Sequence, residues 1–232
     1  MTPSNTSVLL IYTGGTIGMI ENTETGALEN FNFEQLQKHV PELRKSNCTI
    51  DSYQFDPPMD SSDMEPEAWR KLVKIICDNY DRFNGFVILH GTDTMAYTAA
   101  ALSYMIQNSK KPIVITGAQK PIDLEITDAK SNLLDSFLYA SDDKSQGVQI
   151  VFDGKVIAGT RAKKVRSKSY NAFSSIDFPC LAMIQDGNIM RYIPPVPYEE
   201  EVQFYEELDE NVYLIKMIPG IKPRILRSVF EN

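Results

Sequence analysis

Continuous runs of apolar residues, each as long as a β-strand, recur along the chain. Runs of this kind, without alternating polar residues, are typical of strands buried on both faces of a parallel sheet. They are VLLIY at 8–12, GFVILHG at 85–91, PIVITG at 112–117 and GVQIVF at 147–152.

Between these runs, apolar residues follow the three- and four-residue spacing of helices. One helix is predicted from Pro66, with one face formed by Trp69, Leu72, Val73, Ile76 and Tyr80. A second helix carries a stripe of Met95, Ala99, Leu102 and Ile106. A third begins at Thr127 as N-cap and buries Leu133, Leu134, Phe137 and Leu138. Strands that alternate with helices predict an α/β fold in which helices cover both faces of a parallel sheet, giving three layers.

The composition changes after about residue 190. Residues 193–210 are rich in proline and acidic side chains, as linkers often are, and a new strand is predicted at 211–217. This divides the chain into an N-terminal domain at 1–190, a linker at 191–210, and at 211–232 the beginning of a second unit, which one strand cannot complete.

Charge and cysteine content narrow the classes of function. The net charge of −8 argues against a nucleic-acid partner, and the short basic run at 161–168 is interpreted as a solvated face. Three widely separated cysteines, Cys48, Cys77 and Cys180, suggest neither a disulfide framework nor a metal cluster. No signal peptide or membrane span is recognised, so we expect a cytoplasmic protein.

The first run ends in YTGGTIG, residues 12–18. It fails as a dinucleotide fingerprint because Thr13 stands where the first glycine belongs, and as a phosphate loop because no G-K-[ST] follows. Glycines that only turn the chain are one interpretation. The other is a ligand site at the carboxyl edge of the sheet, where Thr13 and Thr16 present their hydroxyls.

The second run continues into Thr92 and Asp93 before a helix, where the aspartate serves either as a cap or as part of the same crevice. A threonine hydroxyl needs a neighbouring base before it attacks a carbonyl group. His90 is expected to be a satisfied core residue, which leaves Lys163 or Lys164 beside Asp93. In the turn-rich loop 57–64, Ser62 and Glu65 match a capping box, but the loop could also hold a small zwitterion.

YTGGTIGM, MDSSDM, FVILHGTDTMAYTA and TRAKKVRSKSYNAFSS together closely resemble the bacterial-type L-asparaginases, in particular the cytoplasmic type I branch. The resemblance implies hydrolysis of L-asparagine to aspartate and ammonia through an acyl-enzyme, without metal or cofactor. By motif, Thr16 would be the nucleophile and Thr92, Asp93 and Lys164 the second catalytic group. Asp60, Ser61 and Ser62 would hold the α-amino and α-carboxylate groups of the substrate, and Thr92 and Asp93 would also contact it.

Two departures from the family pattern stand out. Several relatives carry a tyrosine on the loop after the first motif, where this chain has Ala27 after Gly26. The family also has a smaller C-terminal α/β domain, of which this chain would hold only the beginning. That domain helps to close the neighbouring subunit's site and, in the type I branch, carries an asparagine effector site. A homodimer or homotetramer is expected when it is complete.

Two other functions stay open. The same core serves as the amidase subunit of tRNA-dependent amidotransferases, which usually carry an extra N-terminal domain. A non-catalytic asparagine-binding protein is the other alternative, although such a protein would not need all the proposed catalytic side chains.

Overall fold

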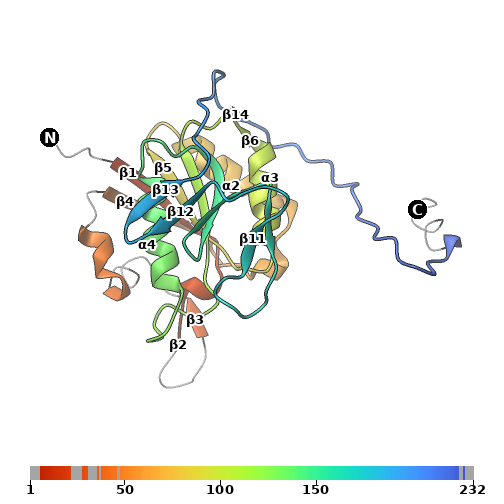
Figure 1. Ribbon diagram of the computed structural model, residues 1–232, viewed down its shortest axis with the longest axis horizontal. Helices are drawn as coiled ribbons and strands as arrows, with labels where there is room; N and C mark the ends of the chain where they lie inside the picture. Colours follow the sequence, from red (N-terminus) through yellow and green to blue (C-terminus); the bar gives the residue numbers. More distant parts are fainter. Residues whose placement is uncertain are drawn as a thin grey trace.

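The computed structural model describes residues 6–21, 28–30, 36, 38–45, 48–224 and 227. Their centre is an eight-stranded sheet in the order β13-β12-β9-β8-β7-β5-β1-β4 (Figure 1). Its parallel strands are β1 (Thr6–Tyr12), β4 (Cys48–Gln54), β5 (Gly85–Leu89), β7 (Pro112–Thr116) and β8 (Gly147–Phe152). The antiparallel strands are β9 (Lys155–Ala158), β12 (Ala182–Gln185) and β13 (Asn188–Arg191).

Short elements complete the described chain. The paired strands outside the main sheet are β2 (Met19–Glu21) with β3 (Leu28–Asn30), β6 (Ile106–Gln107) with β14 (Gln203–Phe204), and β10 (Ala162–Lys164) with β11 (Phe173–Ser175). The 3-10 turns are η1 (Thr16–Gly18), η2 (Pro41–Lys45) and η3 (Ser61–Asp63).

The helices lie close to where the periodicity places them. They are α2 (Pro66–Asn79), α3 (Met95–Met105) and α4 (Ala129–Ala140), and Pro66 occupies the first turn of α2 as predicted. Ile106 was predicted to lie on the α3 stripe, but it has left the helix and pairs in β6. The N-cap of α4 is Asp128 rather than Thr127, although the Thr127 hydroxyl does accept the Ala129 N–H at 3.0 Å.

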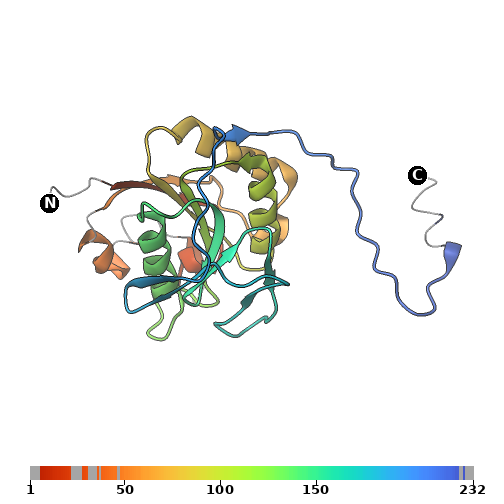
Figure 2. The ribbon, with the colours of Figure 1, turned by 45° about the horizontal axis from the view of Figure 1, so that its top comes forward.

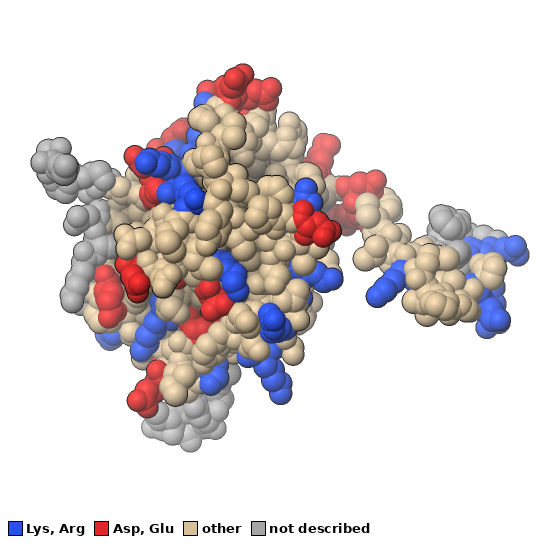
Figure 3. Space-filling model, in the orientation of Figure 1, with Lys and Arg blue, Asp and Glu red and all other residues tan. Residues whose placement is uncertain are grey.

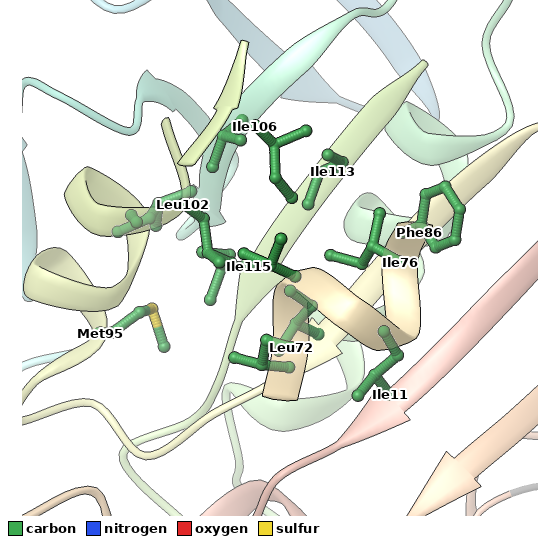
Figure 4. Packing of buried hydrophobic residues seen from close by; sticks show 14 of the residues in the cluster. Ile11, Leu72, Ile76, Phe86, Met95, Leu102, Ile106, Ile113 and Ile115 are labelled. Carbon is green, nitrogen blue, oxygen red and sulfur yellow. The ribbon is translucent and has the colours of Figure 1, made fainter. Parts of the chain in front are cut away.

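Each face of the sheet carries its own core, which gives the predicted three layers. In β1, Leu9 and Ile11 pack with α2 and α3, whereas Val8, Leu10 and Tyr12 pack with α4. Figure 2 shows these helices on opposite sides of the sheet, and Figure 4 shows the α2–α3 side in detail. Each fully buried aliphatic side chain contributes about 1.5–3 kcal/mol, so both layers stabilise the sheet that carries the strand ends.

Strand β4 is not visible in the apolar pattern. It pairs in parallel with β1 along its whole length, but it is an edge strand whose side chains are mostly exposed. Its sequence, CTIDSYQ, is accordingly polar, because an edge strand has only one neighbour and meets water. Continuous apolar runs therefore mark only the central strands.

The acidic segment after β13 packs against the domain. β14 pairs with β6, the ring of Phe204 meets that of Tyr80 edge-on at 5.5 Å, and Arg70 on α2 bonds both the Glu206 carbonyl at 3.1 Å and the Glu210 carboxylate at 2.6 Å. Figure 3 shows acidic side chains where the chain then leaves the body. The segment is thus held at several points between residues 203 and 210.

The strand predicted at 211–217 does not form. These residues have no regular secondary structure and run away from the sheet in an extended path (Figure 1), and Leu214 is 95% exposed. A strand requires a partner for its backbone groups, and no strand of the described residues pairs with this segment.

No described helix is both long and apolar enough to cross a bilayer.

Candidate active site

The strand order opens a crevice between two adjacent strands. β1 continues to β4 on one side, whereas β5 continues to β7 on the other, so the loops after β1 and β5 leave in opposite directions. Open α/β sheets bind ligands at such a switch point, at the carboxyl ends of the strands. Both glycine-bearing motifs, at 13–18 and 90–93, lie there.

Glycines allow the loops at this edge to touch backbone to backbone. A Cβ on Gly15 would lie 2.5 Å from the Gly91 nitrogen, one on Gly91 would lie 2.5 Å from Ser61 Oγ, and one on Gly14 would lie 2.0 Å from the Met59 carbonyl oxygen. Real Cβ atoms do not approach other atoms so closely. The glycines therefore bring the motifs at 13–18, 57–64 and 89–100 into one cluster.

Thr13 and Thr16 have different roles in the first loop. The Thr13 hydroxyl is buried and donates to the Leu89 carbonyl at 3.0 Å, so the prediction that it faces a ligand is wrong. Thr16 opens the η1 turn and is half-buried. Within the described chain its hydroxyl has no hydrogen-bond partner, which leaves it available to react.

Lys164 joins the second motif from a separate hairpin. Its Nζ donates to Thr92 Oγ1 at 2.7 Å and to Asp93 Oδ1 at 2.6 Å. The Lys164 side chain is 16% exposed and the Asp93 side chain 71%, so the pair lies at the border of protein and solvent. The structure thus assembles Thr92, Asp93 and Lys164 as predicted.

The β10–β11 hairpin explains why Lys164, rather than Lys163, reaches the site. Successive side chains of a strand point to opposite faces, and Lys163 is exposed. Lys164 pairs with Phe173, whose ring packs at 4.9 Å on that of Phe152 in the core. The hairpin is therefore anchored on the face that carries Lys164.

The loop at 57–64 presents one carboxylate and holds a buried serine. Asp60 Oδ1 accepts both the N–H and the hydroxyl of Ser62 at 2.9 Å, and the bond from the Ser62 N–H lowers the pKa of Asp60. Ser61 is buried, and its carbonyl accepts the Thr94 hydroxyl at 2.7 Å. The predicted capping box does not form, because the N-cap of α2 is Glu65 and Ser62 bonds to Asp60 instead.

His90 is the satisfied core residue that the sequence predicts. Its ring nitrogens lie 2.8 Å from Thr98 Oγ1 and 2.7 Å from the Gly91 carbonyl oxygen. Complete burial lowers the pKa of His90 to about 4. The ring is therefore neutral at pH 7, and both of its nitrogens are occupied.

Gln119 belongs to the same cluster, although the sequence does not single it out. Its Oε1 accepts the Thr92 hydroxyl at 3.2 Å, and its Nε2 donates to the Ser169 carbonyl at 3.1 Å. The available signal was Gly117, which ends the third apolar run as Gly14 and Gly91 end the first two. Parallel strands β1, β5 and β7 thus contribute loops to one edge of the sheet.

Two cavities flank these loops. One, of about 860 Å³, is lined by Asp93, Tyr97 and Lys164 among others, and the other, of about 610 Å³, includes Met59 and Asp60. Both volumes are typical of small-molecule pockets, which span about 300–1,000 Å³. Among the described residues, no group of three or more His, Cys, Asp or Glu side chains lies close enough together to hold a metal ion.

Comparison with known proteins identifies the family. The model of the asparaginase N-terminal family matches residues 7–196. L-asparaginase 1 of Escherichia coli K12 is 36% identical, over 97% of this chain and 68% of that protein. A glutamyl-tRNA(Gln) amidotransferase component of Pyrococcus abyssi is 35% identical, over 99% of this chain and 55% of that one.

A solved structure agrees with the sequence comparison. The thermostable L-asparaginase from Thermococcus kodakarensis superimposes with a TM-score of 0.91 at 33% identity, and the match covers 97% of this chain and 68% of that chain. Residues 7–196, which the family model matches, include the loops that carry the candidate site. The chain therefore belongs to the asparaginase family.

Proposed function

We propose that this protein hydrolyses L-asparagine to L-aspartate and ammonia, with Thr16 as the nucleophile. The observation that carries the proposal is the cluster formed by Thr92, Asp93 and Lys164 at the switch point where the Thr16 loop also ends. The relatives named L-asparaginase support the choice of substrate.

In the proposed reaction, Thr16 Oγ attacks the side-chain amide carbon of asparagine. The hydroxyl proton passes to the amide nitrogen, the C–N bond breaks, and ammonia leaves an aspartyl ester on Thr16. Water then attacks the ester, giving aspartate and restoring the hydroxyl. Backbone N–H groups at the glycine turns would stabilise each oxyanion, at about 2.7–4 kcal/mol per donor.

Lys164 and Thr92 would move the protons in these steps. Lys164 Nζ donates to Thr92 Oγ1 at 2.7 Å, so its proton can pass to Thr92 as the Thr92 hydroxyl gives up its own. Asp93 orients the lysine from its other side. No metal or cofactor enters the proposed scheme.

The remaining polar groups would recognise the α-amino and α-carboxylate groups of the substrate. Asp60 and Asp93 supply carboxylates that suit an ammonium group, and the lowered pKa of Asp60 keeps it ionised. Ser61 would offer its N–H and hydroxyl to the carboxylate, whereas the two Ser62 donors bond to Asp60 in the structure and would have to turn to the substrate to take part. Ala27, where relatives carry a tyrosine, lies outside the described residues.

Assembly and location are also proposals. We expect a homodimer or homotetramer when a complete C-terminal domain accompanies this chain. Cys48, Cys77 and Cys180 are unpaired in the structure, which suits the reducing cytoplasm.

The amidotransferase component is the main alternative, because one relative carries that name. An asparagine-binding protein without turnover is the second alternative. An amidotransferase component would release ammonia mainly in the presence of its partner, whereas a pure binder would release none.

The test measures ammonia release from L-asparagine and L-glutamine by the chain and by three variants. Thr16→Ala and Lys164→Met should each lower kcat at least about 10³-fold, as removal of catalytic groups that act together does. Lys163→Met, which changes the exposed neighbouring lysine, is the matched control and should retain activity. Full activity of Thr16→Ala would refute the nucleophile. Asparagine binding by calorimetry without ammonia release would favour the binder.

A further inference from the structure

Asp128 joins the loop after β7 to the start of α4. It is 5% exposed, and its carboxylate accepts the Gln119 N–H at 2.9 and 3.1 Å and the Lys120 N–H at 3.1 Å. Asn132 Nδ2 lies at 3.3 Å from the same carboxylate. These donors surround the buried group, so it fixes the backbone at 119–120 from the N-terminus of the helix.

The side chain of Gln119 extends this connection into the site. Its carbonyl oxygen accepts the Thr92 hydroxyl, and its amide nitrogen donates to Ser169, in the loop that follows Lys164. A threonine hydroxyl has a single proton to donate. Because that proton points to Gln119, the lone pairs of Thr92 Oγ1 are left for the Lys164 ammonium.

We propose that Asp128 is a positioning residue that holds Gln119, and through it the Thr92 hydroxyl, in line with Lys164. The inference rests on the proposed function, because the alignment matters only if Thr92 and Lys164 move protons. It adds a buried carboxylate, outside the crevice, to the residues that set the rate.

The hydrogen-bond pattern requires a carboxylate at this position. The backbone N–H groups of Gln119 and Lys120 and the Asn132 amide all donate, so the group between them must accept throughout. An asparagine there would turn an NH₂ group toward at least one of these donors. The loop would then shift, and Gln119 would lose its alignment with Thr92.

The kinetic test compares Asp128→Asn, Gln119→Leu and the double variant with Asp135→Asn. Asp135 is a half-buried carboxylate on the same helix, outside the hydrogen bonds described above. Asp128→Asn and Gln119→Leu should each lower kcat about 10- to 100-fold, as small displacements of reacting groups do, while KM changes less than threefold. The double variant should be no slower than Gln119→Leu, and Asp135→Asn should match the wild type.

If the decreases in kcat of the two single variants multiply in the double variant, the proposal is overturned, because Asp128 would then not act through Gln119. If Asp128→Asn fails to fold in a thermal-unfolding measurement, Gln119→Leu still decides, since wild-type kcat in that variant would refute the alignment.

A second readout does not depend on activity. The side-chain amide NMR signals of Gln119, assigned with Gln119→Leu, should move in Asp128→Asn and stay in place in Asp135→Asn. A wild-type chain that releases no ammonia but shows this shift would refute the proposed function and retain the positioning role of Asp128. Unchanged signals in Asp128→Asn would refute the positioning role.

Discussion

Gly15 lies where the loops after β1 and β5 meet, and the structure leaves no room for a side chain there. Its backbone has φ 92° and ψ 165°, a conformation that only glycine adopts readily, and a Cβ would stand 2.5 Å from the Gly91 nitrogen and 2.6 Å from the Gly91 Cα. We therefore expect Gly15→Ala to lower both stability and activity.

The two penalties can be added. The backbone conformation costs about 1–3 kcal/mol for a residue with a side chain. The contact with Gly91 involves backbone atoms that cannot rotate away, and overpacking of this kind costs about 1–3 kcal/mol. The sum, about 2–6 kcal/mol, compares with a total stability of about 5–15 kcal/mol for typical domains, so the variant should fold but be weakened.

Gly187→Ala is the matched control. Gly187 also has a positive φ, 72°, but nothing lies within 4 Å of its Cβ position in the β12–β13 turn. It should lose only the conformational part, about 1–2 kcal/mol. The difference between the two variants therefore reports mainly the contact between the loops, with at most about 1 kcal/mol from the larger backbone cost at Gly15.

Urea-induced unfolding measures the difference, with fluorescence of Trp69, the single tryptophan, as the probe. Trp69 reports on the core because its Nε1 donates to the Thr98 hydroxyl at 2.9 Å. Gly15→Ala should lose about 1–4 kcal/mol more unfolding free energy than Gly187→Ala and should release ammonia more slowly. Equal losses in both variants, or full activity in Gly15→Ala, would refute the packing argument.

Two further predictions concern pH and the acidic segment. Burial lowers the pKa of His90 from 6.5 to about 4, so the unfolded chain binds a proton that the folded chain does not. The lowered pKa of His90 makes the free energy of unfolding about 3 kcal/mol larger at pH 7 than at pH values below 4, and the difference is lost as the pH falls from 6.5 to 4. His90→Gln should remove this part of the pH dependence of unfolding. Arg70→Gln should change the unfolding free energy by less than about 1 kcal/mol but speed cleavage at Glu206 and Glu210 by a glutamate-specific protease.

Each of these predictions has its own control. The wild type is the reference for His90→Gln, and an unchanged slope between pH 4 and 6.5 in that variant would contradict the role of burial. Lys74→Gln removes the Lys74–Asp78 pair on α2, which does not involve the acidic segment, and should not speed cleavage. Equal cleavage of the Arg70 and Lys74 variants would show that Arg70 does not hold the segment.

The sequence predicts the centre of the sheet better than its edges. A central parallel strand is buried on both faces and leaves a continuous apolar run, as β5 and β7 do. β4 meets water at the edge and has no such run. At residues 211–217 the error is the reverse: the apolar run predicts a strand that does not form. Without a neighbouring strand to pair with, the run remains extended and exposed.

Within the candidate site, the sequence likewise predicts the residues that follow central strands better than those that do not. Thr16, Thr92 and Asp93 directly follow apolar runs, so the sheet geometry alone places them at one edge. Lys164 lies 72 residues after Thr92 and follows no parallel strand, and only the family motif selects it over Lys163.

Gln119 and Asp128 have no comparable motif, and their importance follows from hydrogen bonds that exist only once β5, β7 and α4 have packed. Strand ends determine where the proposed catalytic groups lie, but contacts between loops determine how the protons on those groups are directed. A sequence pattern records the first property because it depends on burial along one segment. It does not record the second, because a bond such as that from Thr92 to Gln119 joins groups 27 residues apart, in the loops that follow two different strands. Orientation in this site is therefore a tertiary property, and the double-variant kinetics of Asp128 and Gln119 measure it directly.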